Sequence, residues 1–138
     1  MSTPEQNKAT LARVYKEAFN ENKLDVIDET YAPNYEFQAP PLKDGTVMSG
    51  REAFKQRVAS FRNAFKDIKY VIQDIIADGD LVAHRAYFGG VQVGEFNGFP
   101  ATNREAYITY IHYALFDENG QIKRTWAGFT NIDEVLGQ

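Results

Sequence analysis

The stretch that decides the fold of this chain is residues 68–87, which read IKYVIQDIIADGDLVAHRAY. β-Branched and aromatic residues dominate both halves of the stretch, and they favour strands. Between them, Asp78-Gly79 is a dipeptide typical of a two-residue hairpin turn. The sequence therefore predicts two antiparallel strands, over residues 68–77 and 81–87, joined by a tight turn.

Two more strands are predicted on the C-terminal side of this hairpin. Residues 105–116 and 121–131 have strand character, and Asn119-Gly120 between them is a second hairpin signal. A loop is predicted over residues 96–104. Glycines that precede it permit a sharp bend of the sheet, namely Gly89, Gly90 and Gly94.

The N-terminal part has the 3.6-residue period of helices instead. Thr3, Pro4 and Gln6 form a helix start with a capping box, and this helix is predicted to end near residues 20–22. A shorter helix is predicted over residues 24–31. The apolar face of the first helix consists of Leu11, Val14, Tyr15, Ala18 and Phe19.

A short strand over residues 35–39 and a third helix follow. Ser49 and Glu52 are predicted to form a second capping box, and the apolar face of that helix consists of Phe54, Val58, Phe61 and Phe65. Helices first and a run of antiparallel strands afterwards predict an α+β fold, with helices on one face of a bent sheet. No linker or repeat divides residues 1–138, so we expect a single domain.

Composition narrows the classes of function. The net charge is −4 and no basic cluster occurs, which argues against a nucleic-acid surface. No apolar run reaches the roughly 18 residues of a membrane helix, and no apolar leader is present at the N-terminus. The absence of cysteine excludes disulfides and thiol chemistry and is compatible with the cytoplasm, where we expect the protein. Aromatic residues, at 14%, suit an apolar ligand pocket as well as a plain core.

Several segments also carry a family resemblance. They are residues 22–35 with Tyr31-Ala32-Pro33, residues 50–52, 78–83 and 94–102, and residues 119–122 with Trp126. In order and spacing the chain resembles the SnoaL-like polyketide cyclases of the nuclear-transport-factor-like superfamily. The resemblance implies a cone-shaped α+β barrel, in which N-terminal helices pack on a strongly curved antiparallel sheet around an internal pocket. It also implies a homodimer that forms through the sheet.

The resemblance implies chemistry without a metal or an organic cofactor. The expected function is a cyclase, isomerase or dehydratase acting on a hydrophobic, oxygenated small molecule such as a polyketide-like compound. A base removes a proton next to a carbonyl, and hydrogen-bond donors hold the enolate. The same fold also hosts non-catalytic ligand-binding modules. The family places an acid four residues beyond the last-strand tryptophan, whereas this chain has Thr130 at that position.

Three residues are the catalytic candidates. Glu36 and Gln38 are two apart on a predicted strand and therefore share a face. The alternation leaves open whether that face is the interior or the solvent side. His112 lies in mid-strand between aromatic residues, where a histidine is either an acid/base group or a buried structural residue. Two histidines on separate strands do not make a metal site, so no metal is expected.

The remaining candidates are expected to bind substrate. Arg85 either stabilises an enolate oxygen or extends from the outer face of the sheet. Aromatic residues on helices and strands form either the pocket wall or simply the core. The predicted substrate-binding set is Tyr15, Phe19, Phe54, His84, Arg85, Tyr87, Tyr107, Trp126 and Thr130.

Overall fold

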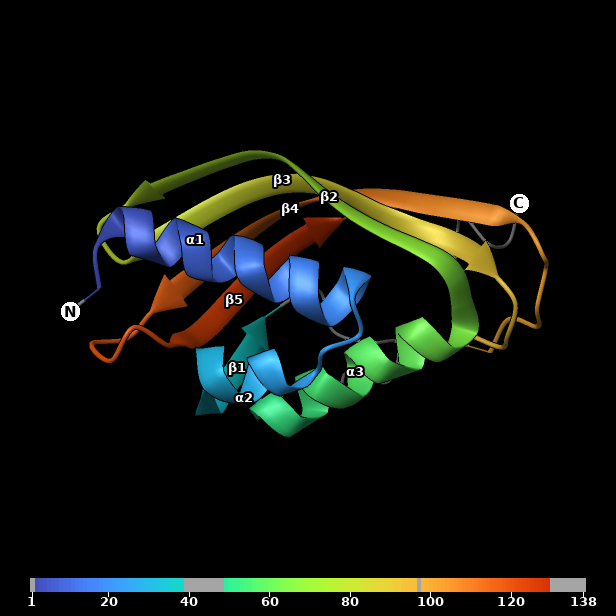
Figure 1. Cartoon of the computed structure of the whole chain (residues 1–138), viewed down its shortest axis with the longest axis horizontal. Coiled ribbons are helices and arrows are strands. Elements are labelled where there is room, and N and C mark those ends of the chain that lie inside the picture. Colours follow the sequence, from blue (N-terminus) through green and yellow to red (C-terminus); the bar gives the residue numbers. More distant parts are fainter. Residues whose placement is uncertain (1, 39–48, 97, 130–138) are drawn as a thin grey trace.

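The computed structural model describes residues 2–38, 49–96 and 98–129 of the chain, and it confirms the α+β fold (Figure 1). Its helical elements lie on one face of a curved sheet of five strands. In chain order the elements are α1 (Pro4–Val14), η1 (Tyr15–Asn20), α2 (Asp25–Thr30), β1 (Tyr31–Gln38), α3 (Arg51–Ala64), β2 (Phe65–Asp78), β3 (Leu81–Gln92), β4 (Glu105–Phe116) and β5 (Ile122–Phe129).

The strands are arranged in the order β1-β5-β4-β3-β2. Strands β2, β3, β4 and β5 pair antiparallel with their neighbours, as predicted. The expectation of a wholly antiparallel sheet is wrong at one edge, because β1 pairs parallel with β5. The first strand enters the sheet from α2 and lies beside the last one, so its partner is set by the packing of helices rather than by a hairpin.

The predicted first helix is confirmed in extent and changes geometry along its length. The side chain of Thr3 accepts from the backbone N–H of Gln6, and the reciprocal bond is present, so the capping box is confirmed. After α1 the chain winds into a single π-helical segment, η1, which begins at Tyr15. Segments of this kind are rare and often occur at functional sites. This one presents Tyr15 and Phe19 to the sheet.

The second predicted capping box is wrong. Gly50, with φ of 85°, is the N-cap of α3, and no side chain caps this helix end. Only a residue without a Cβ adopts that backbone conformation readily. The helix ends at Ala64, and Phe65, predicted to belong to its apolar face, is the first residue of β2.

Strand β2 bends sharply close to its start (Figure 1). Asp67 has φ of 53°, and the register between β2 and β3 shifts between Lys66 and Lys69, which is a β-bulge. Facing it on β3, a Cβ on Gly90 would lie 2.5 Å from the backbone oxygen of Lys66. The bend therefore requires glycine at this position, in agreement with the bending predicted at Gly89-Gly90.

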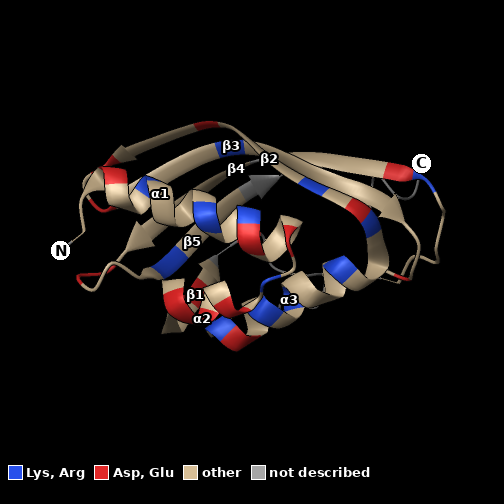
Figure 2. Ribbon diagram, in the orientation of Figure 1, with Lys and Arg blue, Asp and Glu red and all other residues tan. Residues whose placement is uncertain are grey.

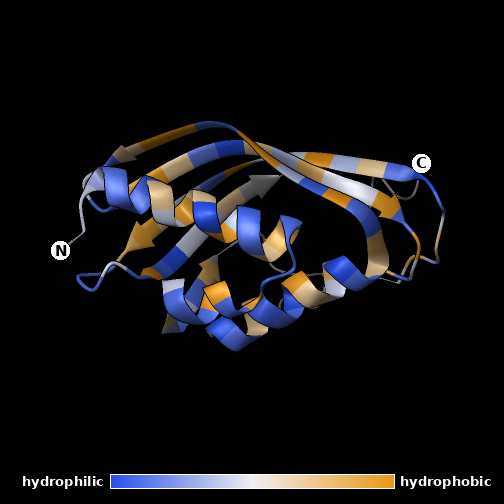
Figure 3. Ribbon diagram, in the orientation of Figure 1, coloured by the Kyte–Doolittle hydropathy of each residue, from blue (hydrophilic) through white to orange (hydrophobic). Residues whose placement is uncertain are grey.

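The core lies between the helices and the concave, inner face of the sheet. Figure 3 shows that hydrophobic and hydrophilic residues alternate along the strands. Figure 2 shows charged residues distributed along α1, α2 and α3. Inward-facing strand residues such as Val82, Ala86 and Ala114 are fully buried. Alternation with period 2 thus gives each strand one core side and one outer side.

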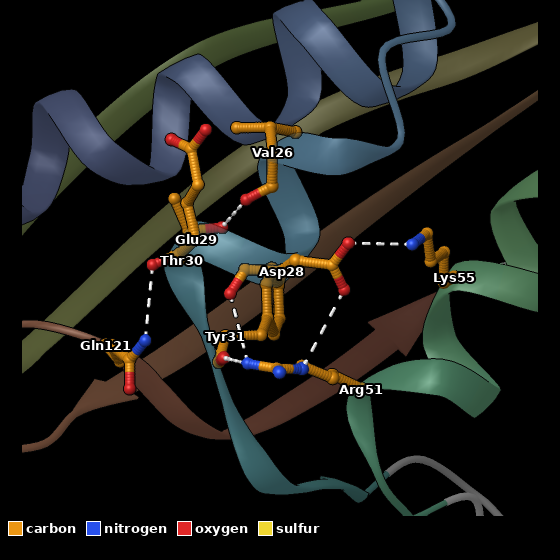
Figure 4. A network of polar contacts seen from close by, with 8 residues as sticks. All are labelled: Val26, Asp28, Glu29, Thr30, Tyr31, Arg51, Lys55 and Gln121. Atoms are coloured by element: carbon orange, nitrogen blue, oxygen red, sulfur yellow. Dashed lines mark hydrogen bonds and ion pairs between the residues drawn. The ribbon is translucent and has the colours of Figure 1, made fainter.

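A polar network joins α2 to α3 (Figure 4). The carboxylate of Asp28 lies 2.8 Å from Nζ of Lys55, and Nη1 of Arg51 donates to the backbone oxygens of Asp28 and Tyr31. The pKa of Asp28 is lowered, chiefly by its hydrogen bond with Lys55. Through its two hydrogen bonds, the guanidinium of Arg51 satisfies backbone carbonyls at the end of α2, where β1 begins.

Candidate functional site

Two histidines lie side by side on the inner face of the sheet. His84 on β3 and His112 on β4 are direct cross-strand partners, and each is 2% exposed. Their ring centroids are 4.7 Å apart. Directly opposed residues of antiparallel strands point to the same face. The alternation that the sequence predicted therefore places both imidazoles beneath the N-terminal helix.

Two tyrosines complete this arrangement. The hydroxyl of Tyr70, on β2, is 2.6 Å from Nε2 of His84, and the hydroxyl of Tyr15, on η1, is 3.3 Å from Nε2 of His112. The two phenol rings stack, with centroids 4.1 Å apart and planes 10° apart. We call these four residues, Tyr15, Tyr70, His84 and His112, the Tyr–His cluster.

Burial keeps both imidazoles uncharged at neutral pH. Desolvation lowers the pKa of His84 to about 4. Desolvation also lowers the pKa of His112 well below its ordinary value, and the neighbouring His84 lowers it further. A neutral imidazole offers a nitrogen lone pair, so the cluster can accept a proton.

Aromatic rings fill the space around the Tyr–His cluster. Phe19 lies 5.1 Å from Tyr70 between ring centroids, and Phe88 stacks on Tyr70 at 5.4 Å. Phe61 of α3 contacts both phenylalanines. In this part of the interior, ring packing occupies the volume that the sequence analysis assigned to a pocket.

Two residues of the inner face, on β1 and β5, are less buried than the Tyr–His cluster. Phe37 and Ala127 lie on the inner face, opposite Thr125 and His112 respectively, yet both are only partly buried. Deeper inside, the hydroxyl of Tyr35 is hydrogen-bonded to that of Thr125, and burial raises the pKa of this phenol.

Phe54 belongs to this second region, where its ring packs against those of Tyr31 and Tyr35. Five predicted site residues thus share the inner side of the sheet: Tyr15, Phe19, Phe54, His84 and His112. They come from η1, α3, β3 and β4, and all five are buried.

Five other predicted site residues do not face the interior. The carboxylate of Glu36 lies 3.2 Å from Nη2 of Arg124 at the protein surface, so the condition for its use as a buried base is not met. The side chain of Arg85 is exposed and is held 2.8 Å from the carboxylate of Asp74. Both arrangements match the solvent-facing alternative that the sequence left open.

The other three of these five are aromatic residues on the outer face. Tyr87 and Tyr107 contact each other edge to face, with centroids 6.3 Å apart. Trp126 pairs with the exposed Tyr113 of β4 and lies beside the guanidinium of Arg124. None of the three lies in the interior, where pocket wall or core was expected, because each occupies the outward phase of its strand. The side chain of Gln38 and all of Thr130 lie outside the described residues.

Sequence reasoning missed Tyr70 and Thr125. In the structure, Tyr70 is the cross-strand partner of Phe88 rather than of a histidine. Its hydroxyl reaches His84 diagonally, after a register shift between Ile72 and Asp74. No pattern in the sequence marks that bulge, so neither bulge nor contact was predictable. The contact of Thr125 with Tyr35 could be identified only once the parallel pairing of β1 with β5 was known.

A groove of about 500 Å³ lies elsewhere, between α3 and residues 94–95. It is lined by the polar residues Gln56, Ser60, Asn63 and Glu95 and by the small residues Ala59, Ala64 and Gly94. None of the predicted site residues contributes to it.

Metal ligands do not gather in the described part of the chain, where no group of three His, Cys, Asp or Glu could hold an ion. Among the same residues, no helix has the length and apolarity needed to span a membrane.

Comparison with known proteins adds a family to this geometry. The family model described as SnoaL-like polyketide cyclase matches residues 9–133. IdmH from Streptomyces antibioticus, a proposed polyketide cyclase, is 30% identical, with a TM-score of 0.78 over 96% of this chain and 99% of that one. TsrD from Streptomyces laurentii is 22% identical, with a TM-score of 0.84 over 99% and 98% of the two chains.

A third similar structure, an NTF2-like protein from Burkholderia pseudomallei, is 18% identical, with a TM-score of 0.74 over 99% of this chain and 97% of that one. At such identities TsrD and this protein share the fold alone. A search of curated proteins finds no match.

Proposed function

Because the chain belongs to the SnoaL-like polyketide cyclase family, we propose that it is a cofactor-independent acid/base enzyme. Its substrate is a hydrophobic, oxygenated small molecule of polyketide type, and the reaction is a cyclisation, isomerisation or dehydration. One observation carries the proposal: the interior holds a buried histidine, His112, that is hydrogen-bonded to a phenol and whose pKa is lowered by burial, which keeps it uncharged.

In the proposed cyclisation, the imidazole of His112 accepts a proton from a carbon next to a substrate carbonyl. The resulting enolate carbon attacks a second carbonyl of the same molecule and forms the new carbon–carbon bond. The alkoxide then takes the proton back from His112, so atoms and charge balance. The hydroxyl of Tyr15, which lies within hydrogen-bond distance of Nε2 of His112, is positioned as the hydrogen-bond donor.

Burial supports this assignment in two ways. An uncharged imidazole is the form that accepts a proton, and desolvation keeps His112 in that form at neutral pH. Aromatic walls exclude water, which would otherwise solvate the enolate and weaken its hydrogen bond to a phenol.

The test is a turnover screen with a panel of hydrophobic aryl β-keto esters and triketones, followed by mass spectrometry. Deuterium incorporation from D₂O reports removal of the carbon-bound proton even where no ring closes. We expect His112→Gln to lower turnover by roughly 10²- to 10⁴-fold, the usual contribution of a positioned general base. The matched control is Arg85→Gln, which changes an exposed strand residue of the outer face. Equal activity of wild type and His112→Gln would refute the catalytic role.

A non-catalytic ligand-binding module is the second candidate. It is favoured by the ring packing around Tyr70, Phe19 and Phe88, which leaves little room for a substrate in that half of the interior. Retention of a panel compound in native mass spectrometry, with no product and no deuterium exchange, would support this candidate over the enzyme.

We also propose that a second copy of this chain covers the outer face of the sheet. A cross-strand row of Ile76, Ala83, Tyr113 and Trp126 runs over four strands, and Ile111 lies beside it. Ile76 is 69% exposed, Ile111 52% and Tyr113 48%. The surface pairs Asp74–Arg85 and Glu36–Arg124 carry both signs of charge around this row. Two copies related by a twofold axis can therefore match apolar to apolar surface and opposite charges to each other.

A further inference from the structure

The last residue of η1, Asn20, is joined to the sheet by its side chain. Its Nδ2 donates to the backbone oxygen of Tyr70, 3.1 Å away, and its Oδ1 accepts from the backbone N–H of the same residue at 2.8 Å. Tyr70 belongs to β2, which lies at one edge of the sheet. Opposed residues of two antiparallel strands exchange the same pair of N–H···O bonds. The carboxamide of Asn20 therefore takes the place of a neighbouring strand at this edge.

A second contact holds the same end of η1 to α3. Nη1 of Arg62 donates to the backbone oxygen of Phe19, the residue before Asn20. A π-helical turn is rare in proteins, so contacts outside the segment must favour it over an α-helical turn. Asn20 and Arg62 provide such contacts where the segment ends, one to the sheet and one to a helix.

The residue that Asn20 binds also supports Tyr15. The ring of Tyr15 stacks on that of Tyr70, with centroids 4.1 Å apart and planes 10° apart. Tyr70 itself is held within the sheet, because it pairs with Phe88 of β3 and its ring stacks on that of the same residue. The position of η1 relative to β2 therefore sets where the ring of Tyr15 lies over the sheet.

The contact between Tyr15 and His112 is the most sensitive to that position. The hydroxyl oxygen of Tyr15 lies 3.3 Å from Nε2 of His112, at the long end for a hydrogen bond. A displacement of η1 away from the sheet by about 0.3 Å would break this bond. By contrast, the 2.6 Å contact of Tyr70 with His84 joins two strands of the sheet and does not involve η1.

We propose that Asn20 is a positioning residue of the candidate site: by holding η1 on the edge of β2, it keeps the hydroxyl of Tyr15 at His112. This inference rests on the proposed function, in which Tyr15 donates the hydrogen bond that stabilises the enolate. Asn20 acts through Tyr15 and touches no reacting atom. Because Asn20 is an exposed residue, its replacement opens no cavity in the core.

NMR of the free protein tests the contact without a substrate. The whole chain contains two histidines, so selective ¹⁵N labelling of histidine reports on His84 and His112 alone. Tyr15→Phe removes the hydroxyl and defines how the Nε2 shift of His112 changes when the contact is lost. We expect Asn20→Ala to move this shift in the same direction, and by more than it moves the Nε2 shift of His84. Lys16→Ala, at an exposed residue of the same segment, is the matched control and should leave both shifts unchanged.

Turnover of a substrate found in the screen supplies a second readout. We expect Tyr15→Phe to lower kcat by about 10²-fold, the usual effect of one lost donor to an oxyanion, and Asn20→Ala by about tenfold, because the donor is displaced and not removed. KM should stay within about threefold of wild type in both variants, since the lost interaction is made in the transition state.

A double-mutant cycle separates positioning from a general loss of stability. In the Tyr15→Phe background, Asn20→Ala should change kcat by less than about twofold, because the hydroxyl that Asn20 positions is already absent. A residue that only stabilises the fold would lower kcat equally in both backgrounds, and that result would overturn the positioning role.

The outcomes distinguish this inference from the proposed function. A wild-type Nε2 shift of His112 in Asn20→Ala, or in Tyr15→Phe, overturns the inference whatever the enzyme does. A moved shift combined with full turnover of His112→Gln supports the positioning of Tyr15 and overturns the proposed base. Should Asn20→Ala not fold, Asn20→Asp is measured instead: it keeps the acceptor for the N–H of Tyr70 and loses the donor. We expect a smaller shift in the same direction, and an unchanged spectrum contradicts the inference.

Discussion

The inner and outer faces of strands β3 and β4 differ completely in chemistry, although their residues alternate along the same backbone. His84 is buried in the Tyr–His cluster, and its neighbour Arg85 is exposed in an ion pair with Asp74. Likewise His112 is buried between two exposed neighbours, Ile111 and Tyr113. One step along a strand therefore separates a candidate base from a candidate subunit interface.

The difference teaches that residue type alone does not assign a role in a half-buried sheet. Arg85 and Trp126 are residue types common in ligand sites, yet the strand phase puts both on the outer face. A histidine in a sequence does not by itself indicate a site, yet the strand alternation that puts Arg85 outside places His112 in the interior. What distinguishes the two faces is the cost of desolvation, which falls only on the inner one.

The largest effect on stability is expected when a tyrosine of the inner face and one of the outer face are each replaced by alanine. Tyr15→Ala removes a ring that is stacked on Tyr70 and 2% exposed, so it should lower the free energy of unfolding by about 3 to 5 kcal/mol. Tyr113→Ala on the outer face should cost less than about 1 kcal/mol in the monomer. Urea denaturation at low protein concentration measures both. Similar losses in the free energy of unfolding for the two variants would contradict the difference in burial between the two faces.

Acid should destabilise the protein through the inner face. Burial lowers the pKa of His84 to about 4, whereas an unfolded chain binds this proton near pH 6.5. The stability is therefore complete above about pH 6.5 and falls as the pH drops towards 4. The gap between these values corresponds to roughly 3 kcal/mol for His84 alone.

Thermal or urea unfolding measured from pH 7.5 to pH 4.5 checks this slope. His84→Gln should flatten it, although the variant itself starts from a lower stability. The control Arg85→Gln, one residue away on the outer face, should keep the wild-type slope. A pH dependence identical in wild type and His84→Gln would contradict the buried neutral state.

A charge on the outer face should affect association and not the interior. Ile111→Glu places a carboxylate beside the exposed apolar row, where like charges of two copies would meet. We expect the dimer dissociation constant to rise at least tenfold, about 1.4 kcal/mol. Light scattering across a dilution series measures it, with Gln73→Glu, an exposed residue of β2, as control. A wild-type monomer at all concentrations would refute the interface.

The smallest effect is expected at Glu36. Its ion pair with Arg124 is half exposed on both sides, so Glu36→Gln should change stability by at most about 1 kcal/mol. Turnover of any substrate found in the screen should stay within about twofold of wild type. A hundredfold loss in kcat with normal folding would restore Glu36 as a catalytic residue and would shift the site towards β1.

By itself, the sequence determined the succession of elements. Helical periodicity with a capping box at Thr3 predicted α1, and the turn dipeptides at Asp78-Gly79 and Asn119-Gly120 predicted both hairpins, because these are local properties of the backbone. Local rules also failed locally, at the start of α3, where Gly50 and not Ser49 is the cap. The family resemblance, confirmed by the match over residues 9–133, supplied the cone-shaped arrangement.

Only the tertiary structure decided which side of each strand faces inward. Alternation defines two faces but does not show which one the helices cover, so the face of Glu36 stayed open and Trp126 was assigned to the wrong face until the pairings of β1, β4 and β5 were known. The contact of Tyr70 with His84 depends in addition on a bulge in β2. Long-range pairing and bulges arise from the packing of distant segments, and that information is not local to any stretch of the chain.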